Sequence, residues 1–140
     1  MKHYGTQQLE TDRLILRKFI EEDAAAMYKN WASDGEVTKY LTWPTHLNPE
    51  ISQSVIKDWI NLYSEENYYN WAIIWKENGN KPIGNISVVD RKENISMVSI
   101  GYCIGRTWWH KGITSEALKA VMDFLFDVVE VKRIEARHDP

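Results

Sequence analysis

The sequence has little cysteine, little net charge and no long apolar run, and each scarcity excludes a class of protein. Cys103 is the single cysteine among 140 residues, which excludes an internal disulfide and a zinc site made of several thiolates. The formal net charge of −3 gives no basic field of the kind that attracts nucleic acid. No apolar run is long enough to span a bilayer, and the N-terminus lacks the apolar core of a signal peptide. We expect a cytoplasmic protein that uses no metal and binds neither nucleic acid nor membrane.

Aromatic side chains are abundant. The chain contains seven Trp, seven Tyr and three Phe, within a composition that is 44% apolar and 26% charged. That balance is typical of a globular protein, and the length suits one domain with one core. We therefore expect residues 1–140 to form a single domain whose aromatics build the core or line a pocket. Trp31, Trp59 and Trp71 are expected in the core.

Hydrophobic periodicity predicts five strands and three helices. The predicted strands cover residues 11–20, 69–75, 83–89, 95–104 and 131–137. The predicted helices cover residues 21–33 and 49–66, and a third has an apolar stripe over 117–128. Asn48, Pro49 and Glu50 predict the start of the second helix, with a capping side chain, a proline at the first position and then an acid. Residues 1–10 are expected to be loosely held and residues 34–47 irregular. Turns join the middle strands into an antiparallel meander, whereas a helix between the last two strands makes them parallel neighbours. This order predicts an α/β (α+β) fold.

The stretch from Val98 to Val128 combines an apolar strand, a short loop with Lys111 and Gly112, and an amphipathic helix. The first turn of a helix leaves N–H groups unpaired at the positive end of its dipole, so this loop can hold an anion. An ordinary helix capped by Thr114 or Ser115 behind a tight turn is the alternative. Neither GxxxxGK[ST] nor GxGxxG is present, so the common nucleotide loops do not apply.

The strand before this loop has one face of small residues only. They are Ser99, Gly101, Cys103 and Gly105. Such a face allows close approach to the strand's backbone.

Six segments, taken together and in this order, resemble the GNAT superfamily of N-acetyltransferases, in the branch that includes the ribosomal-protein alanine N-acetyltransferases. The matching segments are TDRLILR at 11–17, EVTKYL at 36–41, PIGNI at 82–86, IGY at 100–102, WHKGITSEA at 109–117 and RIEAR at 133–137. The resemblance spans essentially all of residues 11–140. It implies a splayed mixed sheet with helices on both faces and acetyl-CoA in the gap between the fourth and fifth strands.

The resemblance also implies which residues hold the cofactor. The backbone of Tyr102, Cys103 and Ile104 would hydrogen-bond the pantetheine arm of acetyl-CoA. The residues implied around its pyrophosphate are Trp109, His110, Lys111, Gly112, Ile113, Thr114 and Ser115.

The chain departs from the family in two ways. The superfamily loop is usually Gln/Arg-x-x-Gly-x-Gly/Ala, but here the first position is Trp109 and the last is Thr114, and His110 stands where the branch often has glycine. Family members also continue through another helix and two strands after the fifth strand. We therefore expect this chain to be truncated after that strand.

The implied reaction is direct acyl transfer from a thioester to an amine, which needs a base for the ammonium proton. Glu135 is the first candidate for the general base, because related N-terminal acetyltransferases have an acid at the matching strand position. The alternative for Glu135 is a surface carboxylate paired with Arg133 or Arg137. Glu36 is a weaker candidate, and Trp43 is a candidate for lining the acceptor pocket.

We expect the other reactive side chains to have no part in catalysis. Cys103 is expected to be a small packing residue rather than a nucleophile. His46 and His138 are expected at the surface.

Three functions remain open from the sequence. The first is an acetyl-CoA-dependent N-acetyltransferase acting on a primary amine, either a protein N-terminus or a small amine. The second is a non-catalytic module that binds CoA or a nucleotide. The third is a structural or interaction domain whose aromatics only fill the core. A homodimer is a possible assembly in each case.

Overall fold

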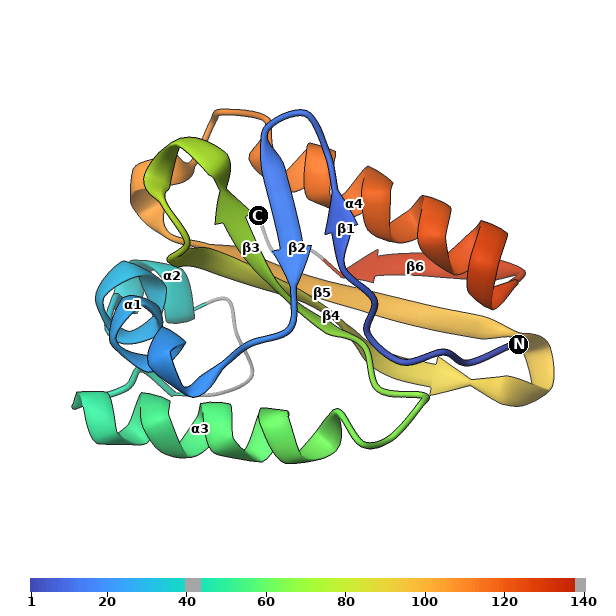
Figure 1. Cartoon of the computed structure of the whole chain (residues 1–140), viewed down its shortest axis with the longest axis horizontal. Helices are drawn as coiled ribbons and strands as arrows, with labels where there is room; N and C mark the ends of the chain where they lie inside the picture. The colour runs from blue at the N-terminus through green and yellow to red at the C-terminus, as the bar shows by residue number, and fades with distance from the viewer. Residues whose placement is uncertain (40–43, 138–140) are drawn as a thin grey trace.

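The computed structural model describes residues 1–39 and 44–137, and its centre is a six-stranded sheet (Figure 1). The strands follow the chain in spatial order: β1 Leu9–Glu10, β2 Leu14–Arg17, β3 Asn70–Trp75, β4 Pro82–Lys92, β5 Met97–Ile104 and β6 Arg133–Arg137. All neighbours are antiparallel except β5 and β6, which are parallel. The predicted meander and the parallel crossover are confirmed. The segment expected to be loose, residues 1–10, contributes the short strand β1.

The helices lie on both faces of this sheet, as expected (Figure 1). On one side are α1 Ala24–Met27, α2 Gly35–Thr38 and α3 Pro49–Leu62, and on the other is α4 Ile113–Phe124. The first predicted helix is continuous from η1 Glu21–Asp23 through α1 to the π-turn η2 Tyr28–Ala32, and a second π-turn, η6 Leu125–Val129, extends α4. No helix in residues 1–39 or 44–137 is both long and apolar enough to cross a membrane.

Side-chain caps explain where two of these helices begin. The Asn48 side chain accepts a hydrogen bond from the Ile51 N–H at the start of α3, with proline at the first helical position, as the sequence predicts. Asp34 caps α2 in the same manner through the Glu36 N–H. The expectation of an irregular segment at 34–47 is therefore wrong for its first part, because a local cap stabilises one helical turn there.

Two apolar clusters hold the layers together. The larger lies between the sheet and α4 and includes Leu16, Trp71 and Val121, each with no exposed surface. The smaller lies between the sheet and the α1–α3 side and includes Trp31 and Ile56, also fully buried. The core positions expected for Trp31 and Trp71 are confirmed, whereas Trp59 is partly buried and packs against the smaller cluster. Each sheet face is buried against a separate helical layer.

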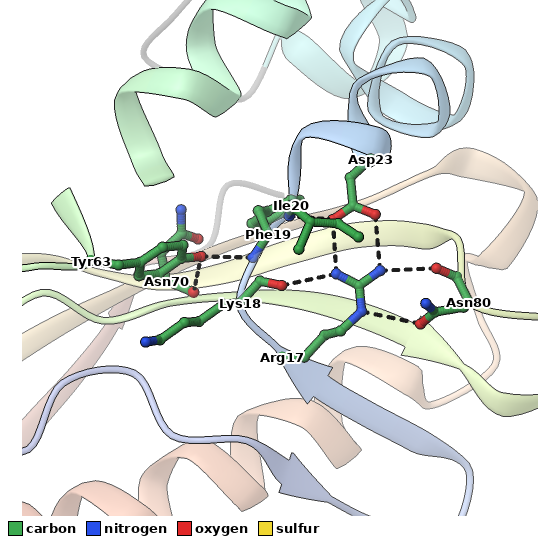
Figure 2. A network of polar contacts seen from close by, with 8 residues as sticks. All are labelled: Arg17, Lys18, Phe19, Ile20, Asp23, Tyr63, Asn70 and Asn80. Atoms are coloured by element: carbon green, nitrogen blue, oxygen red, sulfur yellow. Dashed lines mark hydrogen bonds and ion pairs between the residues drawn. The ribbon is translucent and has the colours of Figure 1, made fainter. Parts of the chain in front are cut away.

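A buried ion pair attaches the α1 side to the end of β2 (Figure 2). The Arg17 guanidinium donates two hydrogen bonds to the Asp23 carboxylate, at 2.8 and 2.9 Å. It also donates to the Lys18 carbonyl and to the side chain and carbonyl of Asn80. Because every one of these contacts satisfies a buried charge, loss of either partner would leave the other unpaired.

Tyr63 makes a second link between α3 and the sheet (Figure 2). Its hydroxyl accepts from the Phe19 N–H at 2.9 Å and donates to the Asn70 carbonyl at 2.8 Å. Burial raises the pKa of Tyr63 well above its ordinary value, so the hydroxyl keeps the proton that it donates.

Gly84 lies where β4 comes closest to β5. A methyl group there would overlap the Cys103 carbonyl oxygen and lie 2.8 Å from the Ile104 Cα. We expect Gly84→Ala to force the two strands apart and to cost about 2 kcal/mol of unfolding free energy. Gly35→Ala is the matched control, because a methyl group there meets nothing within 4 Å. Thermal unfolding of both variants measures the difference, and equal midpoints would contradict the prediction.

Candidate active site

The chain between β5 and α4 turns sharply at two left-handed residues. His110 has φ of 65° and Gly112 has φ of 73°. A single residue separates them, and such alternation turns successive N–H groups toward one side, forming a concavity that suits an anion. Glycine adopts this conformation freely, whereas histidine does so at a cost.

Helix α4 begins without a side-chain cap. Gly112 is the N-cap residue, and the first helical hydrogen bond runs from the Glu116 N–H to the Gly112 carbonyl at 3.2 Å. Within residues 1–39 and 44–137, no acceptor is found for the backbone N–H groups of residues 111–115. The alternative of a helix capped by Thr114 or Ser115 is therefore wrong. These donors remain available to bind an anion. The Lys111 ammonium group lies over the Trp75 ring, 5.8 Å from its centre.

The loop is anchored to the end of β5 by aromatic side chains. The Trp109 indole donates to the Ile104 carbonyl at 2.9 Å. A Cβ on Gly105 would collide with the Asn30 carbonyl oxygen and with the Trp108 ring. Glycine at 105 thus lets the loop pack directly against η2.

Two arginines fix the loop from either side. Arg106 forms a two-bond ion pair with Asp34, at 2.8 and 3.1 Å. Arg13 donates through Nε to Glu116 at 2.7 Å and through Nη1 to the Lys111 carbonyl at 2.9 Å. No role for these contacts is predicted from the sequence, although Arg13 lies in a segment that carries the family resemblance.

Glu116 accepts hydrogen bonds from three donors around the start of β2. Its Oε2 accepts from the Thr11 hydroxyl at 2.5 Å and from the Arg13 N–H at 3.0 Å, and its Oε1 accepts from Arg13 Nε. Partial burial alone would raise the pKa of Glu116, but the hydrogen bonds from Thr11 and Arg13 outweigh it and hold the pKa below its ordinary value. Glu116 is therefore ionised at neutral pH.

Residues 102–104 form the last part of β5. Along β5, Tyr102 pairs with Ile86 of β4, whereas the described register with β6 ends at Gly101 opposite Arg137. The face of small residues is covered by the protein itself, because a Cβ on Gly101 would lie 2.9 Å from a Val89 methyl group. The small face of β5 therefore accommodates Val89 at Gly101.

The two candidate bases lie on the surface of the molecule. Glu135 is on β6 opposite Ser99 and pairs with Arg133 at 3.1 Å, with 47% of its side chain exposed. Glu36 is exposed on α2, where a hydrogen bond and the charge of Lys39 lower its pKa. The pairing of Glu135 with Arg133 matches the alternative considered from the sequence. Trp43 lies outside the described residues.

Two other reactive side chains are buried. The Cys103 thiol donates to the Asn85 side-chain oxygen at 2.9 Å, and burial raises its pKa to about 12. A thiol that stays protonated is a poor nucleophile, which agrees with the packing role expected for it. The surface position expected for His46 is wrong: it is only 4% exposed and bonds Ser52 at 2.7 Å. His138 lies outside the described residues.

A shallow groove of about 490 Å³ lies between β1 and α4, and Thr11 and Glu116 are among its lining residues. Its lining includes Phe124 together with Glu10, Asp123 and Asp127. These acids disfavour an anionic cofactor, so the start of α4 is the better cofactor site. No cluster of metal-ligating side chains is found in the part of the chain that the structure describes.

Comparison with known proteins gives consistent matches. Residues 13–140 match the Acetyltransferase (GNAT) domain family. An uncharacterized N-acetyltransferase, p20 of Bacillus licheniformis, is 34% identical over 136 residues, which are 96% of this chain and 74% of that protein.

Solved structures share the fold. A GNAT-family acetyltransferase from Bacillus anthracis superimposes with a TM-score of 0.79 at 23% identity, over 96% of this chain and 75% of that one. The ribosomal L7/L12 α-N-protein acetyltransferase RimL, in complex with coenzyme A, has a TM-score of 0.77 at 19% identity, over 91% of this chain and 72% of that one.

Replacement of Glu116 by Gln should lower the unfolding free energy by about 2 kcal/mol at neutral pH, because a charged acceptor of three hydrogen bonds is lost. Folding lowers the pKa of Glu116, so its contribution is present above the ordinary carboxyl range and fades as pH falls through the lowered pKa. The gap between wild type and Glu116→Gln should therefore close as the pH falls below about 4.

Urea unfolding at a series of pH values measures this gap. Glu50→Gln is the control, because Glu50 is an exposed acid in the first turn of α3. A gap for Glu116→Gln that stays constant across the pH series would contradict the assigned hydrogen bonds.

Proposed function

The chain belongs to the Acetyltransferase (GNAT) domain family, and we propose that it transfers an acetyl group directly to a primary amine. As a family member it is an acyltransferase that uses acetyl-CoA; the direct route and the acceptor, a protein N-terminus or a small amine, are the proposed parts. The observation that carries the proposal is the uncapped start of α4, where the N–H groups of residues 111–115 have no acceptor among the described residues.

The residues of the loop before α4 are of the kinds that bind the pyrophosphate of acetyl-CoA. A pyrophosphate needs several N–H donors and positive charge, and the loop offers both through its left-handed turns at His110 and Gly112 and through Lys111. The residues that would hold the pyrophosphate are Trp109, His110, Lys111, Gly112, Ile113, Thr114 and Ser115. The backbone edge of Tyr102, Cys103 and Ile104 would hold the pantetheine arm.

Bound acetyl-CoA supplies an acyl group already activated as a thioester. The protein must then orient the amine and accept its proton. An α-amino group has an ordinary pKa near 8 and a lysine amine one near 10.4, so a small fraction of either is neutral at pH 7. A carboxylate that takes the proton, directly or through water, would raise the supply of the nucleophile.

Glu135 is the carboxylate that we assign to this role. It lies on β6, the parallel neighbour of the strand that would carry the cofactor. Its pair with Arg133 is exposed, and such pairs contribute little energy and exchange partners readily. Glu36 is less suited, because Lys39 lowers its pKa and makes it a weaker base.

A cofactor-loop variant tests the site. Gly112→Val should weaken CoA binding by about tenfold or more, since a β-branched residue is strained at this positive φ. Gly79→Val is a control for strain outside the loop: Gly79 has φ of 74° and ψ of −152°, against 73° and 10° for Gly112, and its Cβ position meets nothing within 4 Å. Calorimetry with CoA gives both affinities. Equal affinity for the two variants would place the pyrophosphate elsewhere.

Turnover tests the reaction. Release of the CoA thiol should require an amine, and a panel of peptides with free N-termini, lysine amines and polyamines identifies the acceptor class. Glu135→Gln should lower kcat/KM for the amine by about a hundredfold, typical of a general base, with unchanged CoA affinity. Glu130→Gln is the control, because Glu130 is a similarly exposed, paired carboxylate.

Two outcomes would contradict these assignments. CoA binding without turnover of any amine would favour the non-catalytic CoA-binding module, and full activity of Glu135→Gln under chemistry-limited conditions would remove Glu135 as the base. The cytoplasmic location, the homodimer and the role of Trp43 stay predictions.

A further inference from the structure

We propose that Arg13 is a positioning residue, which holds the loop 109–115 in its anion-binding shape before acetyl-CoA binds. Arg13 acts together with Glu116, which it contacts, and with Thr11, which also contacts Glu116, and we call these three residues the clasp. The proposal rests on the proposed cofactor site at the start of α4.

The clasp spans the row of free N–H groups. One guanidinium group joins the Lys111 carbonyl, at 2.9 Å, to the Glu116 carboxylate, at 2.7 Å. The five uncapped N–H groups belong to residues 111–115, so Arg13 holds both ends of the row. A planar guanidinium group makes these two bonds with fixed geometry, which a lysine ammonium group cannot reproduce.

Arg13 is itself held by the sheet. Its carbonyl accepts from the Lys76 N–H at 2.9 Å, and its N–H donates to Glu116 at 3.0 Å. The Thr11 hydroxyl accepts from the Leu14 N–H at 3.0 Å while donating to Glu116. Leu14 begins β2 and is fully buried. The loop is therefore oriented by a rigid strand, which gives a binding site its precision.

The bond from Arg13 to the Lys111 carbonyl orients the next N–H group. No peptide bond in the described chain is cis, and in a trans peptide the C=O and the following N–H point in opposite directions. With the Lys111 carbonyl held toward Arg13, the Gly112 N–H must point away from Arg13. A flip of this peptide would instead present a carbonyl oxygen where an anion needs a donor.

Arg13 also neutralises a charge that opposes cofactor binding. Glu116 lies in the first turn of α4 and is ionised at neutral pH. Without Arg13, that carboxylate would add a negative charge beside the proposed pyrophosphate site. Loss of Arg13 therefore removes the orientation of the loop and leaves Glu116 uncompensated.

Arg13→Lys and Arg91→Lys form a matched pair for the test. Arg91 also bridges a carboxylate and a carbonyl, with 2.8 Å contacts to Glu93 and to the Asn67 carbonyl, but it lies on β4 outside the loop. In Arg13→Lys we expect the dissociation constant for CoA to rise by about tenfold or more. In Arg91→Lys the change should stay within about twofold.

Three readouts separate positioning from a general loss of structure. In the free protein, backbone ¹⁵N order parameters for residues 111–115 should fall in Arg13→Lys and stay unchanged in Arg91→Lys. KM for acetyl-CoA should rise with little change in kcat at saturation. Affinity for pantetheine, which lacks the pyrophosphate, should not change.

Thr11→Val is a milder variant that keeps every charge, and it should show a smaller rise in the CoA dissociation constant. Wild-type order parameters and CoA affinity in Arg13→Lys would overturn the clasp. Equal losses for CoA and pantetheine would also overturn it, since they indicate general disruption. Failure of the wild-type protein to bind CoA would instead overturn the proposed function, and the cofactor role of the clasp with it.

Discussion

Hydrogen bonding of β5 on both edges is the constraint on which the rest of the structure depends. β5 is antiparallel to β4 and parallel to β6. A parallel neighbour requires a crossover, so α4 must start near the end of β5 and return the chain across the sheet. The first N–H groups of that helix therefore open at the carboxyl end of β5, whatever side chains follow. Strand pairing thus sets the position of the anion site, and the loop decides whether the site can be used.

The shape of that loop depends on residues that are distant in sequence. Asp34, which caps α2, also binds Arg106 at the start of the loop. Arg13, just before β2, binds Lys111 and Glu116 at its far end. The layer of α1, α2 and α3 and the strand layer behind α4 therefore meet at one short segment. Any movement of the loop would have to break an ion pair on one side or the other.

The sequence predicted the elements whose signals are local and missed those set by tertiary contacts. The Asn48 cap of α3 and the meander strands follow from capping chemistry and alternation, and they are confirmed. β1 has two residues and no periodicity to detect. The burial of His46 and the bond from Arg13 to Glu116, 103 positions apart, depend on chain segments that only the fold brings together. For the same reason, the sequence alone matches Arg13 to a family segment but does not predict what its side chain contacts.

The proposed site has two halves: a cofactor half, made of the loop 109–115 and the end of β5, and an acid–base half, made of the candidate carboxylates. The two halves differ in how they are built. Backbone donors and ion-paired anchors form the cofactor half. Arg13 is 38% exposed and Arg106 is 54% exposed, and their contacts hold the loop in the free protein. Glu135 and Glu36 are exposed and paired with neighbouring cations. Burial under cofactor and acceptor would raise a carboxylate's pKa and strengthen it as a base. Glu36 starts lower because of Lys39. We infer that basicity is acquired on binding, which favours the carboxylate on β6 beside the cofactor strand.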